Sequence, residues 1–328
     1  MKKTELSLSR RQVLATLGIA ALSSPFALFA QSDRPITLVL PVGAGSGVDT
    51  IIRAASLALN KAFKHTVVIE NKPGAGGIIG TSTLIKAPAD GFTLGVVSNN
   101  HVVYPSVYKN VPFDPIADIT PISVIGATPF LLVVNPKKIS ATTVQQFIAE
   151  LKAKPGKYNY ASSGNGTILH LAAAMFVDQA NVECRHIPYK GVGPMLTDLM
   201  GGQVDFAVSS LPSLLPHLQS GALRALGACG STRLPSLPDL PTIAEQGLPD
   251  YESQGWFAAV GPARLPDADV QRTYAAFKDA YSDPEVKKSM DIQGNTIFSM
   301  SPKDSAAFFK AEMAKYAQVV KNAGIEKV

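Results

Sequence analysis

The chain has 328 residues, of which 46% are hydrophobic and 17% are charged, and its formal net charge at pH 7 is +5. This composition is typical of a globular protein and excludes a disordered chain. The two cysteines, Cys184 and Cys229, have no metal-ligand spacing, and the sequence leaves open whether they form a disulfide or remain free thiols.

The first thirty residues have the pattern of an export signal. Basic residues at positions 2, 3, 10 and 11 precede an uncharged, apolar stretch at 13–30, as in the charged and hydrophobic regions of a signal peptide. We expect cleavage after Ala30 and a mature protein in the periplasm. Residues 9–14 resemble a twin-arginine signal in which Val13 replaces the usual phenylalanine, so both export routes stay open.

Without this segment the chain is close to electrically neutral. Residues 1–30 carry four basic groups and one acidic group, so their removal lowers the net charge to about +2. The sequence therefore gives no reason to expect a nucleic-acid partner. No later stretch is apolar over the length that a membrane-spanning helix needs.

Two glycine-rich turns follow the first two predicted strands. Residues 41–49 connect a strand at 36–40 to one amphipathic helix at 48–63, and residues 71–77 follow a strand at 67–70. Backbone N–H groups at the start of a helix lack intrahelical partners and lie at the positive end of its dipole, so they bind carboxylates and phosphates. Two such turns on neighbouring strands would face one crevice at the carboxyl edge of the sheet.

We predict that these turns supply ligand-binding residues, namely Val42, Gly43, Ala44, Gly45, Ser46, Asp49, Gly74, Ala75 and Gly76. The alternative, that the glycines serve only the geometry of the turns, stays open. Asp49 also fits a structural role, because a carboxylate in the first turn of a helix is stabilised by the dipole. Neither turn matches a dinucleotide fingerprint or a Walker motif, so we expect no nucleotide cofactor.

A third predicted strand, at 92–97, follows a helix at 78–86 and ends in a polar turn of Ser98, Asn99, Asn100 and His101. These side chains are candidates to hold the far end of a ligand, and the alternative is that Asn99 and Asn100 only cap a turn. His101 has no second histidine or cysteine at metal-binding spacing, so we expect no metal there. Residues 104–121, rich in proline and aromatic residues, are predicted to form an ordered loop.

The middle of the chain repeats the strand, turn and helix plan. An apolar stretch at 122–135 holds one or two strands, and we place a crossing into a second domain at 133–136. A helix at 142–152 starts with a capping box of Thr142 and Gln145. The next strand, from residue 158, runs into a third donor-rich turn, whose candidate ligand residues are Ser162, Ser163, Gly164, Asn165, Gly166 and Thr167.

Further strands at 185–188, 204–208 and 223–229 alternate with helices, which predicts an α/β fold with a mostly parallel sheet. A run at 253–261 returns the chain to the first domain, and two helices with apolar stripes end it. We therefore assign residues 31–134 and 255–328 to domain 1 and residues 135–254 to domain 2.

The sequence contains no clear catalytic arrangement. His170 falls inside a predicted helix and His186 inside a predicted strand, so no histidine is clearly set beside a serine. Tyr189 and Lys190 are only a weak acid/base candidate. The serines at candidate cleft edges stand outside any Gly-x-Ser-x-Gly elbow; they are Ser46, Ser162, Ser163 and Ser209. We expect a binding protein and no enzyme, with a periplasmic serine hydrolase acting on carboxylic esters as the alternative.

Six segments in chain order resemble the serial motifs of the Bug proteins, the periplasmic substrate-binding components of tripartite tricarboxylate transporters. They are the glycine turn that ends at Asp49, ENKPGAGG at 70–77, YASSGNGT at 160–167, HIPYKG at 186–191, GQVD at 202–205 and LPDLPT at 237–242. The resemblance covers essentially the whole mature chain.

This resemblance implies a type II-like periplasmic binding protein fold, in which two α/β domains are joined by two crossing strands. The domains would close by a hinge motion on a small carboxylate, which is then delivered to two membrane permease subunits. The resemblance places the proximal carboxylate at 42–46 and 74–76, and further polar contacts at 98–101 and 162–167. Tyr189 and Ser209 complete the predicted set of ligand residues.

Two departures from the family pattern bear on the ligand. Val42 and Ala44 stand where the family often has an aromatic residue and a proline, which leaves room for a bulkier ligand. Ser209 and Ser210 stand where it often has Asp-Asn, so an acidic group that would neutralise an amine is missing. We expect a dicarboxylate or an aromatic carboxylate without an amino group, bound by a monomer with no cofactor and no metal. A partner that presents its ligand to a sensor kinase is a further alternative.

Overall fold

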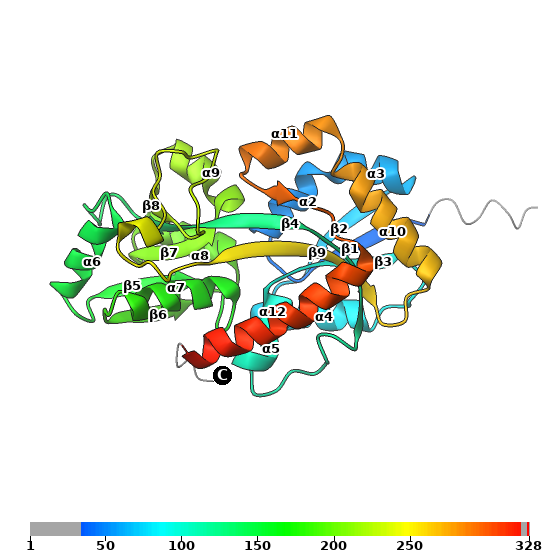
Figure 1. Cartoon of the computed structure of the whole chain (residues 1–328), viewed down its shortest axis with the longest axis horizontal. Coiled ribbons are helices and arrows are strands. Elements are labelled where there is room, and N and C mark those ends of the chain that lie inside the picture. The colour runs from blue at the N-terminus through cyan, green and yellow to red at the C-terminus, as the bar shows by residue number, and fades with distance from the viewer. Residues whose placement is uncertain (1–33, 323–326, 328) are drawn as a thin grey trace, which may run out of the picture. The chain divides into compact units, whose positions relative to one another are not determined.

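The computed structural model describes residues 34–322 and residue 327. The predicted export signal, residues 1–30, lies outside the described residues. The described residues from Pro35 onward belong to one compact unit, in which helices pack on a mixed β-sheet (Figure 1). The α/β class predicted from the sequence is confirmed.

The strands of the described residues are β1 (Ile36–Leu40), β2 (Val67–Asn71), β3 (Thr93–Ser98), β4 (Ile119–Val134), β5 (Tyr158–Ser162), β6 (Cys184–Pro188), β7 (Phe206–Ser210), β8 (Arg224–Ala228), β9 (Gln254–Pro262) and β10 (Thr296–Ile297). The α-helices are α2 (Gly47–Ala54), α3 (Ser56–Phe63), α4 (Ile78–Ile85), α5 (Asn100–Val107), α6 (Val144–Lys152), α7 (Ile168–Gln179), α8 (Val192–Gly201), α9 (Leu211–Gln219), α10 (Asp267–Ala280), α11 (Pro284–Ile292) and α12 (Pro302–Asn322). Two short 3₁₀ helices, η2 (Ala75–Gly77) and η3 (Ala244–Gln246), accompany them.

The strands form one sheet in the order β2-β1-β3-β9-β4-β7-β5-β6, and β8 and β10 also pair with β4. β1 runs parallel to β2 and β3, and β5 runs parallel to β6 and β7. The carboxyl ends of each parallel set therefore share one edge of the sheet. The turns that leave those ends are the predicted ligand-binding turns.

The long strand β4 connects two parts of the sheet. Its residues Ile119–Pro129 pair with β9, and its residues Phe130–Val134 pair with β7. We call β1, β2, β3, β9 and β10 the first half-sheet and β5 to β8 the second half-sheet. The assignment of the chain to two separate domains stays a prediction.

Aromatic side chains pack in the core of both half-sheets. Beside the first, Phe63 and Phe277 meet edge to face with ring centroids 5.8 Å apart. Beside the second, Phe147 meets Phe206 edge to face at 5.2 Å, and all four rings are buried. Such pairs stabilise the fold beyond the area that they bury.

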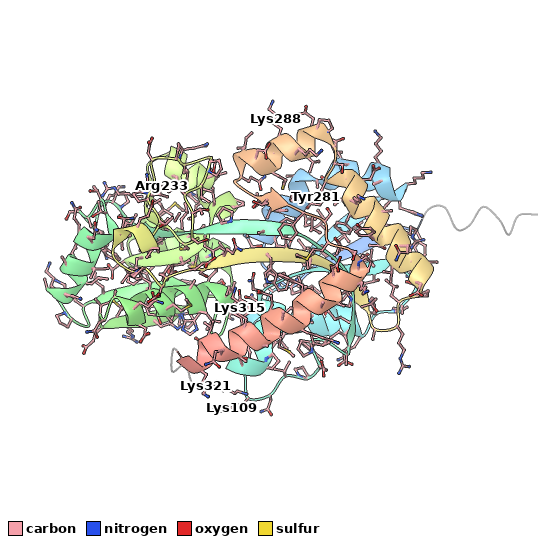
Figure 2. All side chains as sticks on the ribbon, viewed as in Figure 1. Lys109, Arg233, Tyr281, Lys288, Lys315 and Lys321 are labelled. Atoms are coloured by element: carbon pink, nitrogen blue, oxygen red, sulfur yellow. The ribbon has the colours of Figure 1, made fainter. Side chains whose placement is uncertain are left out.

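Lysine side chains lie on the outside of the molecule, as Figure 2 shows for Lys109, Lys288, Lys315 and Lys321. Among the described helices, none combines the length and the apolar character that crossing a membrane requires.

The prediction of a single helix at 48–63 is wrong. The chain forms two helices, α2 and α3, which are separated at Ala55, where φ is −94° and ψ is 1°. The Ala55 N–H donates to Ile52 O at 3.2 Å, which is a 3₁₀ bond. The apolar spacing could not reveal this break, since Val48, Ile52, Ala55 and Leu59 all stay buried.

The prediction of a loop at 104–121 is also wrong in its first part. There α5 extends to Val107 and contains Pro105. Proline inside a helix removes a backbone hydrogen bond and is locally unfavourable. The helix forms because its apolar side chains are buried, and it packs along α12 (Figure 1). Tertiary packing thus outweighs the local penalty.

Two helices that the sequence analysis did not predict, α9 and α11, begin with a proline in the first turn, Pro212 and Pro284. Proline is favoured there because its fixed φ suits the helix and its missing N–H would have no partner. The cap of α6 was placed one residue early: Thr143 accepts from the Gln146 N–H at 3.2 Å.

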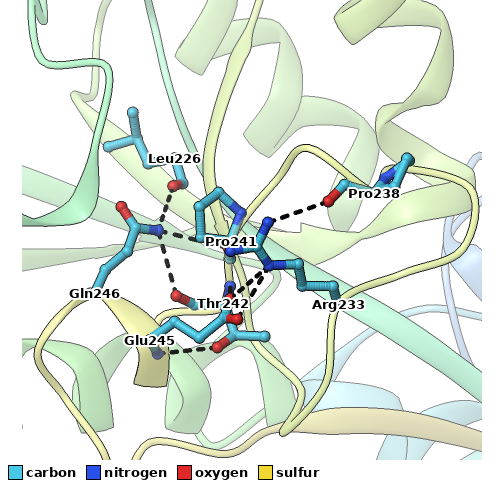
Figure 3. A network of polar contacts seen from close by, with 7 residues as sticks. All are labelled: Leu226, Arg233, Pro238, Pro241, Thr242, Glu245 and Gln246. Atoms are coloured by element: carbon cyan, nitrogen blue, oxygen red, sulfur yellow. Dashed lines mark hydrogen bonds and ion pairs between the residues drawn. The ribbon is translucent and has the colours of Figure 1, made fainter.

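The proline-rich segment before β9 is held by a polar network (Figure 3). The carboxylate of Glu245 accepts from Arg233 Nε at 2.9 Å and from the Thr242 N–H at 2.8 Å. The side-chain amide of Gln246 donates to Leu226 O at 2.9 Å and accepts from the Val144 N–H at 2.8 Å. Gln246 therefore ties the segment to β8 and to the first turn of α6.

Candidate functional site

A cavity of about 340 Å³, the main cavity, lies where the turns after β1, β2, β5 and β6 meet. Twelve of the residues predicted to bind the ligand line it: Val42, Gly43, Ser46, Gly74, Ala75, Gly76, Asn100, Ser163, Gly164, Asn165, Thr167 and Tyr189. The parallel pairing explains this convergence, because it brings the carboxyl ends of β1 and β2, and of β5 and β6, to common edges.

A second cavity of about 60 Å³, the small cavity, adjoins the main cavity and shares Val42, Ser46, Asn100, Ser163 and Val192 with its wall. Two more of the predicted residues, Ser98 and Asn99, line this small cavity. The others lie outside both walls; they are Ala44, Gly45, Asp49, His101, Ser162, Gly166 and Ser209.

The fourth turn, after β6, contributes wall residues that the sequence analysis left out. Pro188, Lys190, Gly191 and Val192 line the main cavity. Gly191 has φ +119°, which a residue with a side chain rarely adopts. The signal was available, because this turn also joins a predicted parallel strand to a helix. The remaining unpredicted wall residues of the main cavity are Pro41, Pro73, Gly77 and Tyr108.

Ser210, and not its neighbour Ser209, faces the small cavity. Ser209 is fully buried in β7 and its hydroxyl has no hydrogen-bond partner among the described residues. Successive side chains of a strand point to opposite faces, so a shift of one residue moves a side chain away from the site.

Backbone N–H groups are the most numerous unused donors in the wall of the main cavity. Within the described part of the chain, several wall residues form no hydrogen bond through their amide; they are Val42, Gly43, Ala75, Gly76, Ser163, Asn165, Lys190 and Gly191. These donors come from all four turns. Clustered amides of this kind can hold a carboxylate with charge-assisted hydrogen bonds.

Asp49 shapes the first turn from behind the main cavity. Its buried carboxylate accepts from the Gly45 N–H, from Arg53 Nε and from Asn71 Nδ2, each at 2.9 Å. Asn71 also donates to Val42 O at 3.3 Å. Asp49 therefore joins the first turn to the second, and it uses the Gly45 amide that we expected to be free for a ligand.

Asn100 and Tyr108 connect the second turn to the third. Asn100 Nδ2 donates to Gly76 O at 3.2 Å, while its Oδ1 accepts from the Ile168 N–H at 2.8 Å. The Tyr108 hydroxyl donates to Asn165 O at 2.6 Å. A Cβ on Gly76 would lie 2.4 Å from this hydroxyl, so only glycine fits there.

Of the described residues in the wall of the main cavity, Lys190 alone is charged, and it is exposed. None of these described wall residues is Asp or Glu. A positive charge in a wall without acidic residues, together with unused amides, favours an anionic ligand over a cationic one.

Ser162 and His186 lie side by side, contrary to our expectation that no histidine is set beside a serine. Their Oγ and Nε2 atoms are 2.6 Å apart. Ser162 is fully buried and lies in neither cavity wall, and among the described residues no carboxylate contacts His186. A buried hydroxyl cannot reach an ester substrate, so this pair is structural.

The histidines near the third turn form an uncharged stack. The rings of His170 and His186 are 3.9 Å apart, with Tyr160 stacked on His186 at 4.9 Å. Burial lowers the pKa of His170 to about 4. Burial and the neighbouring His170 lower the pKa of His186 to about 3. His170 Nδ1 accepts from the Gly166 N–H at 3.2 Å, which holds the third turn.

The remaining candidate groups have structural surroundings. His101 is buried, and its Nε2 lies 2.6 Å from Pro115 O; burial lowers its pKa to about 4. Both cysteines are free thiols. Across the described residues, no three His, Cys, Asp or Glu side chains cluster as metal ligands would.

We predict that Asp49→Ala destabilises the protein and weakens ligand binding. The variant leaves three donors without their buried charged acceptor, so the free energy of unfolding should fall by about 2 kcal/mol, as measured by urea denaturation. Glu70→Ala is the matched control, because it removes an exposed ion pair with Lys72 and should change stability by less than about 0.5 kcal/mol. Equal losses in the two variants would contradict the role given to Asp49.

We predict that stability falls as the pH is lowered from about 6.5, where a histidine of the unfolded chain begins to bind a proton, toward the folded pKa of His170. In this range the unfolded state binds more protons than the folded state, so the free energy of unfolding decreases with decreasing pH. His170→Asn keeps an acceptor for Gly166 and should reduce the proton uptake on unfolding at pH 5 by about one proton. Urea denaturation from pH 4 to 7 measures this slope, and an unchanged slope would contradict the prediction.

Comparison with known proteins identifies the family. Residues 51–325 match the model described as the tripartite tricarboxylate transporter family receptor, TctC. The chain is 33% identical over 313 residues to protein BugT of Bordetella pertussis, covering 95% of each chain.

Solved structures agree with this assignment. The periplasmic binding protein BugD is 29% identical and has a TM-score of 0.86, with 90% of this chain and 99% of that chain covered. R. palustris Rpa4515 with adipate is 32% identical, with the same TM-score and coverage. The predicted periplasmic binding protein fold and the predicted Bug-family resemblance are both confirmed. The chain belongs to the TctC family of solute-binding receptors of tripartite tricarboxylate transporters.

Proposed function

We propose that the protein binds a small carboxylate in the main cavity and carries it to the membrane subunits of a tripartite tricarboxylate transporter. The observation that carries this proposal is the set of unused amides contributed by four turns around one cavity. Carboxylates and phosphates both match such donors, and the adipate and malate bound by relatives of similar fold favour a carboxylate. A cavity of about 340 Å³ is within the range of small-molecule sites.

The ligand has no amino group in this proposal. An ammonium group in the main cavity would find Lys190 and no acidic side chain, so its desolvation would not be compensated. A dicarboxylate or an aromatic carboxylate fits these conditions. The adipate held by Rpa4515, a relative of similar fold, is a dicarboxylate without an amine, which supports this choice.

The protein acts as a monomer in the periplasm and closes on its ligand by a hinge motion, without cofactor, metal or catalysis. An anion that is held mainly by backbone amides can be released reversibly. When the hinge opens, water can again solvate both the amides and the ligand. The burial of Ser162 disfavours the alternative of an ester hydrolase.

We predict that carboxylates without an amine raise the melting temperature, whereas aspartate and glutamate do not. At a hundredfold excess over the dissociation constant, a ligand should add about 2.7 kcal/mol to the free energy of unfolding. Differential scanning fluorimetry against a panel of dicarboxylates, aromatic carboxylates and acidic amino acids measures this, and calorimetry gives the affinities.

A matched pair of variants separates binding of the ligand in the main cavity from general electrostatic attraction of an anion to the protein surface. Lys190→Met removes the charge in the wall of the main cavity, whereas Lys109→Met removes an exposed charge elsewhere. The first should weaken binding and the second should not. Stabilisation by amino acids alone, or equal effects of the two variants, would contradict the proposed site.

A further inference from the structure

The small cavity contains a buried polar group that the binding of a carboxylate in the main cavity does not use. Thr128, on β4, is 95% buried and lines the small cavity. Its Oγ1 has no hydrogen-bond partner among the described residues. A buried hydroxyl without a partner is unfavourable in a folded protein and calls for an explanation.

Most other polar side chains in the wall of the small cavity already have protein partners. Asn99 accepts from the Trp256 N–H at 2.8 Å and donates to the Tyr316 hydroxyl at 2.6 Å. Ser46 accepts from the Asp49 N–H at 3.3 Å, and the Ser210 and Ser213 hydroxyls are 2.9 Å apart. Within the described residues, only the hydroxyls of Thr128 and Ser98 lack such a partner in this wall.

The rest of the wall is apolar and carries no charge. Val48, Phe130, Ile168, Leu169 and Trp256 contribute to it, and no charged residue does. A second carboxylate in this cavity would lose its water without gaining a cation. The wall therefore favours a group that is neutral but can form a hydrogen bond.

The size of the small cavity limits that group further. Its volume of about 60 Å³ is less than half of the roughly 150 Å³ of an engineered cavity that binds benzene. An aromatic ring does not fit, whereas a single oxygen substituent with its carbon does. Because Val42, Ser46, Asn100, Ser163 and Val192 belong to both walls, one ligand can occupy both cavities.

We propose that the small cavity receives an uncharged hydroxyl or carbonyl group of the bound carboxylate, which forms a hydrogen bond with Thr128. This inference rests on the proposed function, since it places the carboxylate itself in the main cavity. It narrows the ligand from carboxylates in general to oxygen-substituted ones.

The test compares carboxylates that differ by one oxygen substituent. Succinate is paired with L-malate and D-malate, and butanoate with 2-, 3- and 4-hydroxybutanoate and with acetoacetate, so that both hydroxyl and carbonyl arms and several positions are covered. The best substituted member should bind about threefold to tenfold more tightly than its parent, which is the effect of one hydrogen bond. Isothermal titration calorimetry measures each dissociation constant.

Variants of Thr128 show whether this preference comes from the small cavity. Thr128→Val is nearly isosteric and should reduce the preference to less than about twofold, while Thr128→Ser, which keeps the hydroxyl, should retain it. Thr273→Val is the matched control, because Thr273 also has a buried, unpartnered hydroxyl but lies outside both cavity walls; it should leave the preference unchanged.

The melting temperature of Thr128→Val without ligand separates a binding role from a structural one. Loss of an unpartnered hydroxyl should leave this temperature unchanged or raise it, and a clear decrease would contradict the proposal. Thr128→Ala serves as a second variant if the valine variant does not fold. If carboxylates bind but the preference is absent, or survives in Thr128→Val, this inference fails and the proposed function stands. If no carboxylate binds, both fail.

Discussion

The site depends on backbone amides that the fold leaves without partners at the carboxyl ends of parallel strands. Most of these amides belong to turn residues between a strand and the following helix, and the four turns bring them to one cavity. These amides stay apart only if the turns are braced. Asp49 braces the first turn against the second, and Asn100 braces the second against the third. The polar side chains thus serve mainly to hold the backbone in place.

If the ligand binds as we propose, the main cavity recognises its charge and the small cavity recognises another part of it. The main cavity offers amides and one exposed lysine, which suit many carboxylates equally well. Among the described residues, the small cavity offers apolar walls and the buried, unpartnered hydroxyl of Thr128, which suit few groups. A receptor built in this way can keep its anion site unchanged while changes in the smaller wall select another ligand.

The turns could be predicted from the sequence because their signals are local: glycine after an apolar strand, followed by an amphipathic helix. Contacts between strands could not. Ser162 and His186 meet because β5 and β6 pair in a register that sets Tyr160 opposite His186, and side chains two positions apart share a face. Nothing near either residue specifies that register. The sequence also does not show which residues of β7 face the small cavity. We therefore predicted Ser209 as a ligand residue, although Ser210 lines that cavity.

The residues that distinguish the small cavity lie on strands rather than on turns. Thr128 and Phe130 belong to β4, and Trp256 belongs to β9, which pairs with it. These two strands also connect the half-sheets, so their side chains are fixed by the core and by the pairing of long strands. A motif search of the turns therefore suggests an anionic ligand but gives no information on its finer structure. For this chain, we infer that groups selecting the ligand are better sought on β4 and β9 than on the turns, because burial makes each unpaired polar atom there informative.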